Sequence, residues 1–203
     1  KKDNENIAKV FGGNLLFGMI ITVIFSLISL IFSKQVLGMY TNDMNIVKLG
    51  SEYLIINAVS YIPMLLIMIY ASVLRSTGRV KSPMYAGVVA VVLNTILNYL
   101  LIFGKFGLPE IGFLGTAYAT TITRFVEAGI LIVYTYVNKY PGAYKIKDMS
   151  DISYVFMKKI LIIASPLLIN EFMWALGETM YSIVYGRMRS EERRVGKECP
   201  RCV

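Results

Sequence analysis

The stretch from Ser82 to Gly104 reads SPMYAGVVAVVLNTILNYLLIFG and contains no Asp, Glu, Lys or Arg. A bilayer core roughly 30 Å thick requires about 20 consecutive apolar residues in a helix, because lipid offers the backbone no hydrogen-bond partners. The stretch meets this requirement and predicts a transmembrane helix. Val10 to Ser33 and Tyr53 to Leu74 are equally long blocks without charged residues. Several helices of this chain are therefore expected to cross a membrane.

Two further segments, Ile111 to Asn138 and Ile160 to Gly186, are as long but carry a few ionised residues. The 203-residue chain is 56% hydrophobic and has a mean hydropathy of +0.58, which is typical of membrane proteins. We therefore predict an all-α fold, a polytopic transmembrane helical bundle. Its five helices are expected at about 10–33, 53–74, 82–104, 111–138 and 160–186.

The sequence changes character after Met188, where it continues RSEERRVGKECPRCV. This string resembles the translation of a sequencing-library adaptor, so we set residues 189–203 apart as an expected artefactual tail. Without them 16 basic and 10 acidic residues remain, and the chain has neither Cys nor His. The Cys-Pro-Arg-Cys string is accordingly not interpreted as a redox or zinc site. The chain begins with Lys rather than Met, shows no signal peptide, and is expected to have lost its start.

Basic residues alternate between the loops. One set comprises Lys1, Lys2, Lys9, Arg75, Arg79, Lys81, Lys139, Lys145, Lys147, Lys158 and Lys159, whereas the intervening loops hold only Lys34, Lys48 and Lys105. The positive-inside rule makes the loops 75–81 and 139–159 cytoplasmic. The positive charge is then explained by topology and anionic lipid, and no nucleic-acid partner is expected.

Ionisable groups at membrane depth are costly and invite a functional hypothesis. Around Pro166, the last predicted helix carries Asn170, Glu171, Trp174 and Glu178. Seven residues advance a helix by nearly two turns, so the two carboxylates share a face with the indole between them. A carboxylate beside an aromatic ring suits a proton, Na+ or an organic cation, although Glu178 can also be a solvated residue near the outer interface.

Two polar groups lie on the preceding pair of predicted helices. Asn94 and Asn98 are four residues apart and share one face, where interhelical hydrogen bonding is the structural alternative to a cavity. The neighbouring helix carries a stripe made of Thr116, Thr120, Thr123, Arg124 and Glu127. The last two can form a structural ion pair or contact substrate. Without His or Cys, no usual catalytic or zinc-binding set is present, so an enzyme is not expected.

Three strings are similar to those of the multidrug and toxic compound extrusion (MATE) family: LRSTGRVKSPM at 74–84, LNTILNYLLIFG at 93–104 and GFLGTAYAT at 112–120. The structural positions of this resemblance are Arg75, Gly78, Pro83, Gly104, Gly112, Gly115 and Pro166. It implies twelve helices in two lobes. The five here resemble the third to seventh, with 1–148 forming most of the first lobe and 149–188 the start of the second.

The resemblance also implies a function, namely export of small organic, often cationic, compounds in exchange for H+ or Na+. It implies no cofactor besides the coupling ion, a monomer when full length, and a bacterial inner-membrane location. Some relatives bind the cation through an Asp, an Asn and a Thr matched here by Asn98, Asn94 and Thr120, so the acidic ligand is missing. Others use an acidic residue that Glu171 resembles, and we favour Glu171. A lipid or oligosaccharide flippase and a non-transporting scaffold subunit are the alternatives.

Overall fold

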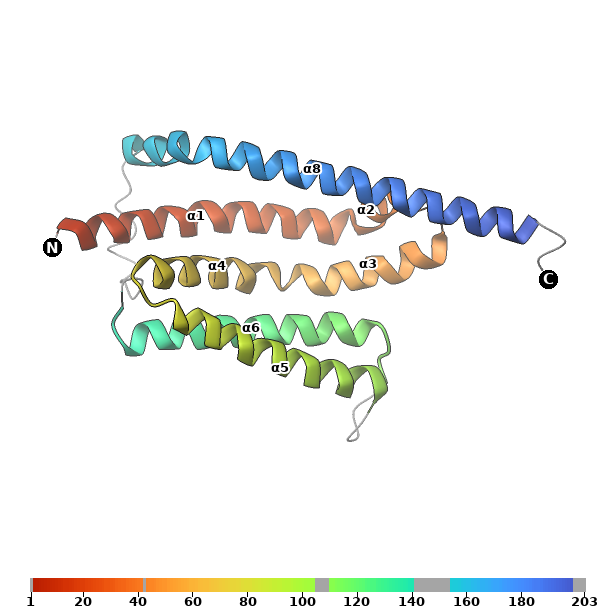
Figure 1. The fold of residues 1–203 in the computed structure, drawn as a ribbon, viewed down its shortest axis with the longest axis horizontal. Coiled ribbons are helices and arrows are strands. Elements are labelled where there is room, and N and C mark those ends of the chain that lie inside the picture. Colours follow the sequence, from red (N-terminus) through yellow and green to blue (C-terminus); the bar gives the residue numbers. More distant parts are fainter. Residues whose placement is uncertain (1, 42, 105–109, 141–153, 199–203) are drawn as a thin grey trace. The chain divides into compact units, whose positions relative to one another are not determined.

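The computed structural model describes the chain except residues 1, 42, 105–109, 141–153 and 199–203; inside the helices, it leaves out the side chains at 2–9, 154–157, 159–161, 187 and 189–198. Every regular element in the described part is a helix, which confirms the all-α expectation (Figure 1). In chain order these are α1 (Lys2–Ile31), α2 (Ser33–Gly38), α3 (Met44–Ala58), α4 (Tyr61–Ser76), α5 (Lys81–Phe103), α6 (Leu114–Val137) and α8 (Tyr154–Glu198).

The chain forms two compact units. The first contains residues 1–30 and 53–153, and therefore most of α1, the end of α3, and α4 to α6. The second contains residues 31–52 and 154–203, and therefore α2, the start of α3, and α8. The predicted lobe boundary near residue 148 lies outside the described residues and stays a prediction.

Two helical segments in the described part are long and apolar enough to cross a membrane, Val10–Ile31 and Lys81–Phe103. The bent pair α3 and α4 makes a third if it is one span. The predicted spans at about 111–138 and 160–186 do not reach this standard, because charged and amide side chains dilute the apolar runs of α6 and α8. For these two helices, spanning stays a prediction.

The helix expected at about 53–74 differs from a single rod. It is split into α3 and α4, whose axes are bent by 48° around Val59 and Ser60. The cause lies in Pro63, in the first turn of α4. Proline has no amide hydrogen, and its ring clashes with the carbonyl four residues earlier, that of Val59, so the helix cannot run through this point.

Hydroxyl groups from neighbouring helices bind the carbonyl groups at this break. The amide of Ser60 turns to the carbonyl of Asn57, at 2.9 Å, and no longer reaches Ile56. Thr121 of α6 instead donates its hydroxyl to the Ile56 carbonyl at 3.3 Å, and Ser26 of α1 donates to that of Ala58 at 3.1 Å. Lipid cannot satisfy such groups, so these bonds make the break tolerable at membrane depth.

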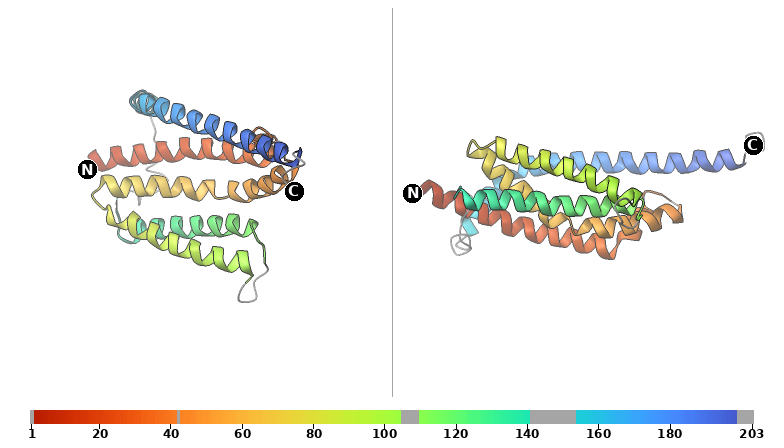
Figure 2. Two further views of the ribbon diagram at one scale, coloured as in Figure 1. Left: turned by 45° about the vertical axis from the view of Figure 1, so that its right-hand side comes forward. Right: turned by 90° about the horizontal axis from the view of Figure 1, so that it is seen from below.

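Helices α5 and α6 form a hairpin and lie side by side in both figures (Figures 1 and 2). The hairpin depends on two glycines. Gly104 ends α5 in the left-handed conformation at φ 60°, which a side chain rarely adopts. Gly115 lies so close to α5 that a Cβ there would be 3.0 Å from the backbone of Leu101. The helix ends can approach only because this position has no side chain.

Helix α8 continues through Pro166 rather than ending there. Proline at 166 leaves the carbonyl of Ile162 without its usual amide donor, as the sequence suggests, but Ser165 fills the gap by donating its hydroxyl at 2.8 Å. The helix also runs on to Glu198, through part of the stretch that we set apart as foreign. That assignment stays a prediction.

Candidate functional site

Small residues bring α5 and α6 together. On α5, Ala86 and Ala90 are four residues apart and almost fully buried, and they face α6 through the same stripe that continues to Asn94. On α6, Ala119 is fully buried one turn after Gly115, the glycine that approaches the backbone of Leu101 in α5. Small residues let helix backbones approach closely in membrane proteins, where dispersion contacts rather than hydrophobic burial drive association. Polar side chains on these faces are therefore held at short range.

The predicted amides and one predicted hydroxyl form a chain across this helix pair. Asn98 donates its amide to the Asn94 oxygen at 2.9 Å, one turn away on α5. Asn94 in turn donates its amide to the Thr120 hydroxyl of α6 at 3.5 Å, a long contact. The structure thus brings together Asn94, Asn98 and Thr120, which the family resemblance groups as an expected cation site.

The free end of this chain is the side-chain oxygen of Asn98. It is buried and has no hydrogen-bond partner among the described residues. A buried acceptor without a partner is costly, and neutral amide and hydroxyl oxygens are ligands that hard cations accept. The cluster of Asn94, Asn98 and Thr120 can therefore accept a donor or a cation. Because all three groups are uncharged, none of them can carry a coupling proton.

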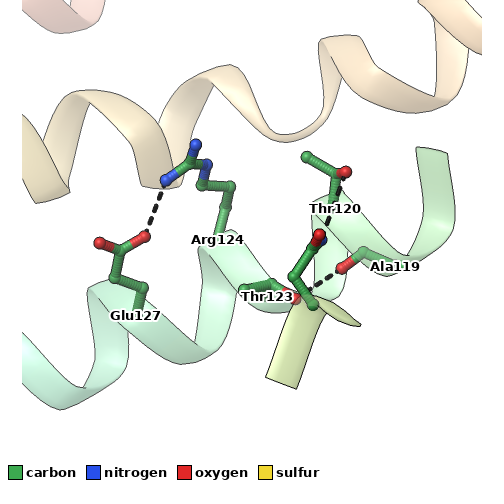
Figure 3. Close-up of polar contacts among 6 residues, drawn as sticks. Ala119, Thr120, Thr123, Arg124 and Glu127 are labelled. Atoms are coloured by element: carbon green, nitrogen blue, oxygen red, sulfur yellow. Dashed lines mark hydrogen bonds and ion pairs between the residues drawn. The ribbon is translucent and has the colours of Figure 1, made fainter. Parts of the chain in front are cut away.

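A salt bridge lies further along α6 (Figure 3). Arg124 donates from Nη1 to Oε2 of Glu127 at 2.8 Å, so the predicted pairing is present. The two partners are unequally covered, with 40% of the Arg124 side chain exposed against 9% for Glu127. The carboxylate lies over α5, 3.9 Å from where a Cβ on Gly87 would be. The guanidinium is the accessible member of the pair.

A groove of about 410 Å³ follows these groups between α5 and α6. Sequence reasoning identified five of its polar members, Asn94, Thr120, Thr123, Arg124 and Glu127, but missed Thr95 and the small and apolar residues that shape it. Spacing of three and four residues on α5 is the signal that could have found them. The complete lining is Gly87, Ala90, Val91, Asn94, Thr95, Thr120, Thr123, Arg124 and Glu127.

Two predicted polar residues, Thr116 and Thr123, donate hydrogen bonds to the backbone next to them. The Thr116 hydroxyl donates a hydrogen bond to the Phe113 carbonyl at 2.7 Å, in the first turn of α6. Thr116 does not line the groove. Thr123 likewise donates within α6, to Ala119 at 2.7 Å. Four residues of the predicted stripe therefore line the groove, and Thr116 does not: Thr120, Thr123, Arg124 and Glu127.

The motif residues between α4 and α5 shape the turn. Gly78 has φ 78°, and the amide of Arg79 bonds the Leu74 carbonyl at 2.8 Å, which closes the end of α4. Pro83 occupies the first turn of α5, where a missing amide hydrogen costs nothing. Arg75 is exposed. Gly112, with φ 61°, has the same left-handed backbone just before α6.

The residues predicted on α8 belong to the second unit and are exposed there. Asn170, Glu171 and Glu178 are uncovered, and 67% of Trp174 is accessible. Among the residues that the structure describes, Glu171 has neither a hydrogen-bond nor an ion-pair partner. Its carboxylate and the indole of Trp174, one turn further along α8, are both accessible.

Comparisons with known proteins link this sequence to one family. The MatE family profile matches residues 1–100. A probable multidrug resistance protein of Bacillus subtilis, YoeA, is 31% identical over 182 residues, which cover 87% of this chain and 39% of that protein. The probable multidrug resistance protein NorM of Thermotoga maritima is 36% identical over 115 residues, 56% of this chain and 24% of that one. No solved structure gives a significant match. The chain thus spans well under half the length of these relatives.

Proposed function

Because this chain belongs to the MatE family of multidrug efflux transporters, we propose that the protein exports small organic, often cationic, xenobiotics in exchange for H+ or Na+. The observation that carries this proposal is the similarity to multidrug resistance proteins over 182 residues. The apolar helices agree with it, since they identify an integral membrane protein. Because the relatives are bacterial proteins, we propose the bacterial plasma membrane as its location. From the distribution of basic loops, we propose that 75–81 and 139–159 lie inside.

We propose Glu171 as the residue that couples export to cation entry. Two features support this choice: the carboxylate has no partner among the described residues, and Trp174 lies about one turn away on the same helix. A carboxylate with an adjacent aromatic face can hold H+, Na+ or an organic cation, the last through cation–π attraction. Asn98 cannot couple export to H+ entry, because its amide has no titratable proton.

In the proposed cycle, the two lobes of the full-length protein alternate between outward-open and inward-open states. Glu171 binds the coupling cation from outside and releases it inside, and the organic compound occupies the site in the other half of the cycle. When a neutral compound leaves as one cation enters, the net inward movement of one charge through roughly 100 mV supplies about 2.3 kcal/mol. That energy supports about a fifty-fold concentration gradient of substrate. When the compound is itself a monovalent cation, the exchange moves no net charge and the concentration gradient of the coupling ion supplies the energy.

The groove between α5 and α6 serves as part of the cavity wall in this proposal. Its members Asn94, Thr120 and Arg124 keep one side of the path polar, which a charged or amphipathic substrate needs within a membrane. The single accessible guanidinium gives this wall little positive charge. A cation can therefore pass it, whereas a flippase for anionic headgroups is expected to need a more basic surface.

The test is efflux of ethidium from proteoliposomes that contain the full-length protein, with an imposed pH or Na+ gradient. The Glu171→Gln variant is expected to lose gradient-driven efflux, and Glu171→Asp to retain part of it. Glu52→Gln is the matched control, because Glu52 is an exposed carboxylate on α3 outside the proposed site. Efflux by Glu171→Gln at the wild-type rate would refute the coupling role. Flux without any gradient dependence in the unmodified protein would refute the antiport proposal itself.

A further inference from the structure

A second groove, distinct from the polar one, lies where α5 begins and α6 approaches its end. It has a volume of about 260 Å³. We call it the interfacial groove, and its lining consists of Lys81, Ser82, Tyr85, Ala86, Val89, Ile130, Leu131 and Tyr134. Its mouth carries an ammonium group and hydroxyls, while its walls are aliphatic. The groove is therefore amphipathic along its length.

A network of aromatic and hydroxyl groups fixes the mouth. The Tyr134 hydroxyl is hydrogen-bonded to both Ser82 and Tyr140, and the rings of Tyr134 and Tyr140 lie 5.5 Å apart. The bond to Tyr134, with burial as a smaller cause, raises the pKa of the Tyr140 hydroxyl. Arg79 is stacked over the Tyr140 ring at 4.5 Å. This network links the α4–α5 turn to the end of α6 and holds a second cation near Lys81.

These two cations are available to an anion. Arg79 and Lys81 are exposed, and among the described residues neither has a carboxylate within salt-bridge distance. The tyrosines around them are the residue type that prefers the membrane–water interface. A cationic drug would be repelled by this mouth, and a free phosphate would gain nothing from Val89, Ile130 and Leu131. The ligand that matches both ends has a phosphate and a hydrocarbon chain.

We propose that the interfacial groove binds one anionic phospholipid, with its phosphate on Arg79 and Lys81 and an acyl chain against the aliphatic walls between α5 and α6. Basic pockets between transmembrane helices bind anionic headgroups in this way. The site does not depend on the efflux proposal, since it uses none of the residues assigned to coupling. It ties the hairpin of α5 and α6 to the lipid leaflet at the 75–81 loop.

The test is native mass spectrometry of the purified full-length protein in a mild detergent, titrated with phosphatidylglycerol or with phosphatidylcholine of the same acyl chains. Wild-type protein is expected to bind phosphatidylglycerol at least tenfold more tightly. The double variant Arg79→Gln, Lys81→Gln is expected to lose about thirty-fold in phosphatidylglycerol affinity, or about 2 kcal/mol for two interfacial charges. The matched control, Lys34→Gln with Lys48→Gln, removes two exposed lysines elsewhere and is expected to change the affinity less than twofold.

Two further arms separate this site from general charge attraction. Val89→Trp fills the groove at a residue that is 50% exposed. It is expected to lower the affinity for both lipids at least fivefold while the helical circular dichroism stays unchanged. Glycerol phosphate, a headgroup without chains, is expected not to compete. Equal affinity for the two lipids, an equal loss in the lysine control, or full competition by glycerol phosphate would each overturn the proposal.

Discussion

The break between α3 and α4 supports a quantitative prediction about Thr121. Its hydroxyl donates a hydrogen bond to the Ile56 carbonyl at 3.3 Å. Among the described residues, no other side chain of α6 bonds this carbonyl. Thr121→Val keeps the shape of the side chain and removes this donor. The Ile56 carbonyl then has no other hydrogen-bond donor, because the amide of Ser60 is bonded to the Asn57 carbonyl and lipid offers no donor.

The expected cost follows from the geometry. Leaving a buried acceptor unpaired costs about 1–3 kcal/mol in soluble proteins, whereas hydrogen bonds between transmembrane helices average about 0.6 kcal/mol with a maximum near 1.7. The 3.3 Å distance of this bond is long for a hydroxyl donor, so a value of about 0.5–1 kcal/mol is expected. For a chain of this length, that corresponds to a fall in Tm of roughly 1–4 °C.

The measurement is thermal loss of helical circular dichroism in a mild detergent. Thr95→Val is the matched control, because the Thr95 hydroxyl bonds only the Val91 carbonyl of its own helix, at 2.9 Å. That carbonyl keeps its helical amide donor, so the control is expected to change Tm by less than 1 °C. Ser26→Ala, which removes the bond to the Ala58 carbonyl at 3.1 Å, is expected to resemble Thr121→Val. Equal Tm values for Thr121→Val and Thr95→Val would refute the role assigned to the break.

Three other predictions concern the α5–α6 pair. Gly115→Val places a side chain 3.0 Å from the Leu101 backbone and is expected to cost about 1–3 kcal/mol. Gly129→Ala meets nothing within 4 Å and should not lower Tm, because Ala favours a helix interior over Gly; an equal fall in Tm for both variants would show that the close approach is unimportant. Arg124→Gln leaves the buried Glu127 carboxylate without its cation and is expected to lower Tm more than Glu127→Gln, which removes that carboxylate. The Tm of the double variant is expected to lie between those of the two single variants. A lower Tm for Glu127→Gln than for Arg124→Gln would contradict the role of the unequal burial. Asn98→Asp introduces an acidic group into the amide cluster, and its Tm is expected to be higher in Na+ than in choline. The wild type should show a smaller Tm difference between these two salts; equal differences would argue against a cation site there.

Much of the fold follows from the sequence because lipid imposes a simple rule. Any apolar block of sufficient length must be helical, and this fixed the all-α class and the Lys81–Phe103 helix to within a residue or two. The rule says little about interruptions. It predicted one helix over 53–74, where Pro63 and the bonds of Ser26 and Thr121 stabilise a bend. A proline near the middle of the block was visible, but its hydroxyl partners lie on other helices.

The candidate site divides in the same way. Helical spacing identified Asn94, Asn98 and Thr120 as polar residues that share helix faces, and the structure joins them in one hydrogen-bonded chain. The same spacing could not show that Thr116 bonds its own helix, because hydroxyl orientation depends on the first-turn backbone. The coupling role of Glu171 stays a proposal from sequence and resemblance.

By itself, then, the sequence determined that this is a helical membrane protein and which helix faces carry polar groups, because hydropathy and a period of 3.6 residues are local properties. Only the tertiary structure decided which groups meet. It placed Arg79 over Tyr140 and left the side-chain oxygen of Asn98 buried without a partner among the described residues. It also formed one polar and one amphipathic groove along the same helix pair. Such contacts depend on the rotation and separation of neighbouring helices, which small residues such as Gly115 set and no single helix encodes.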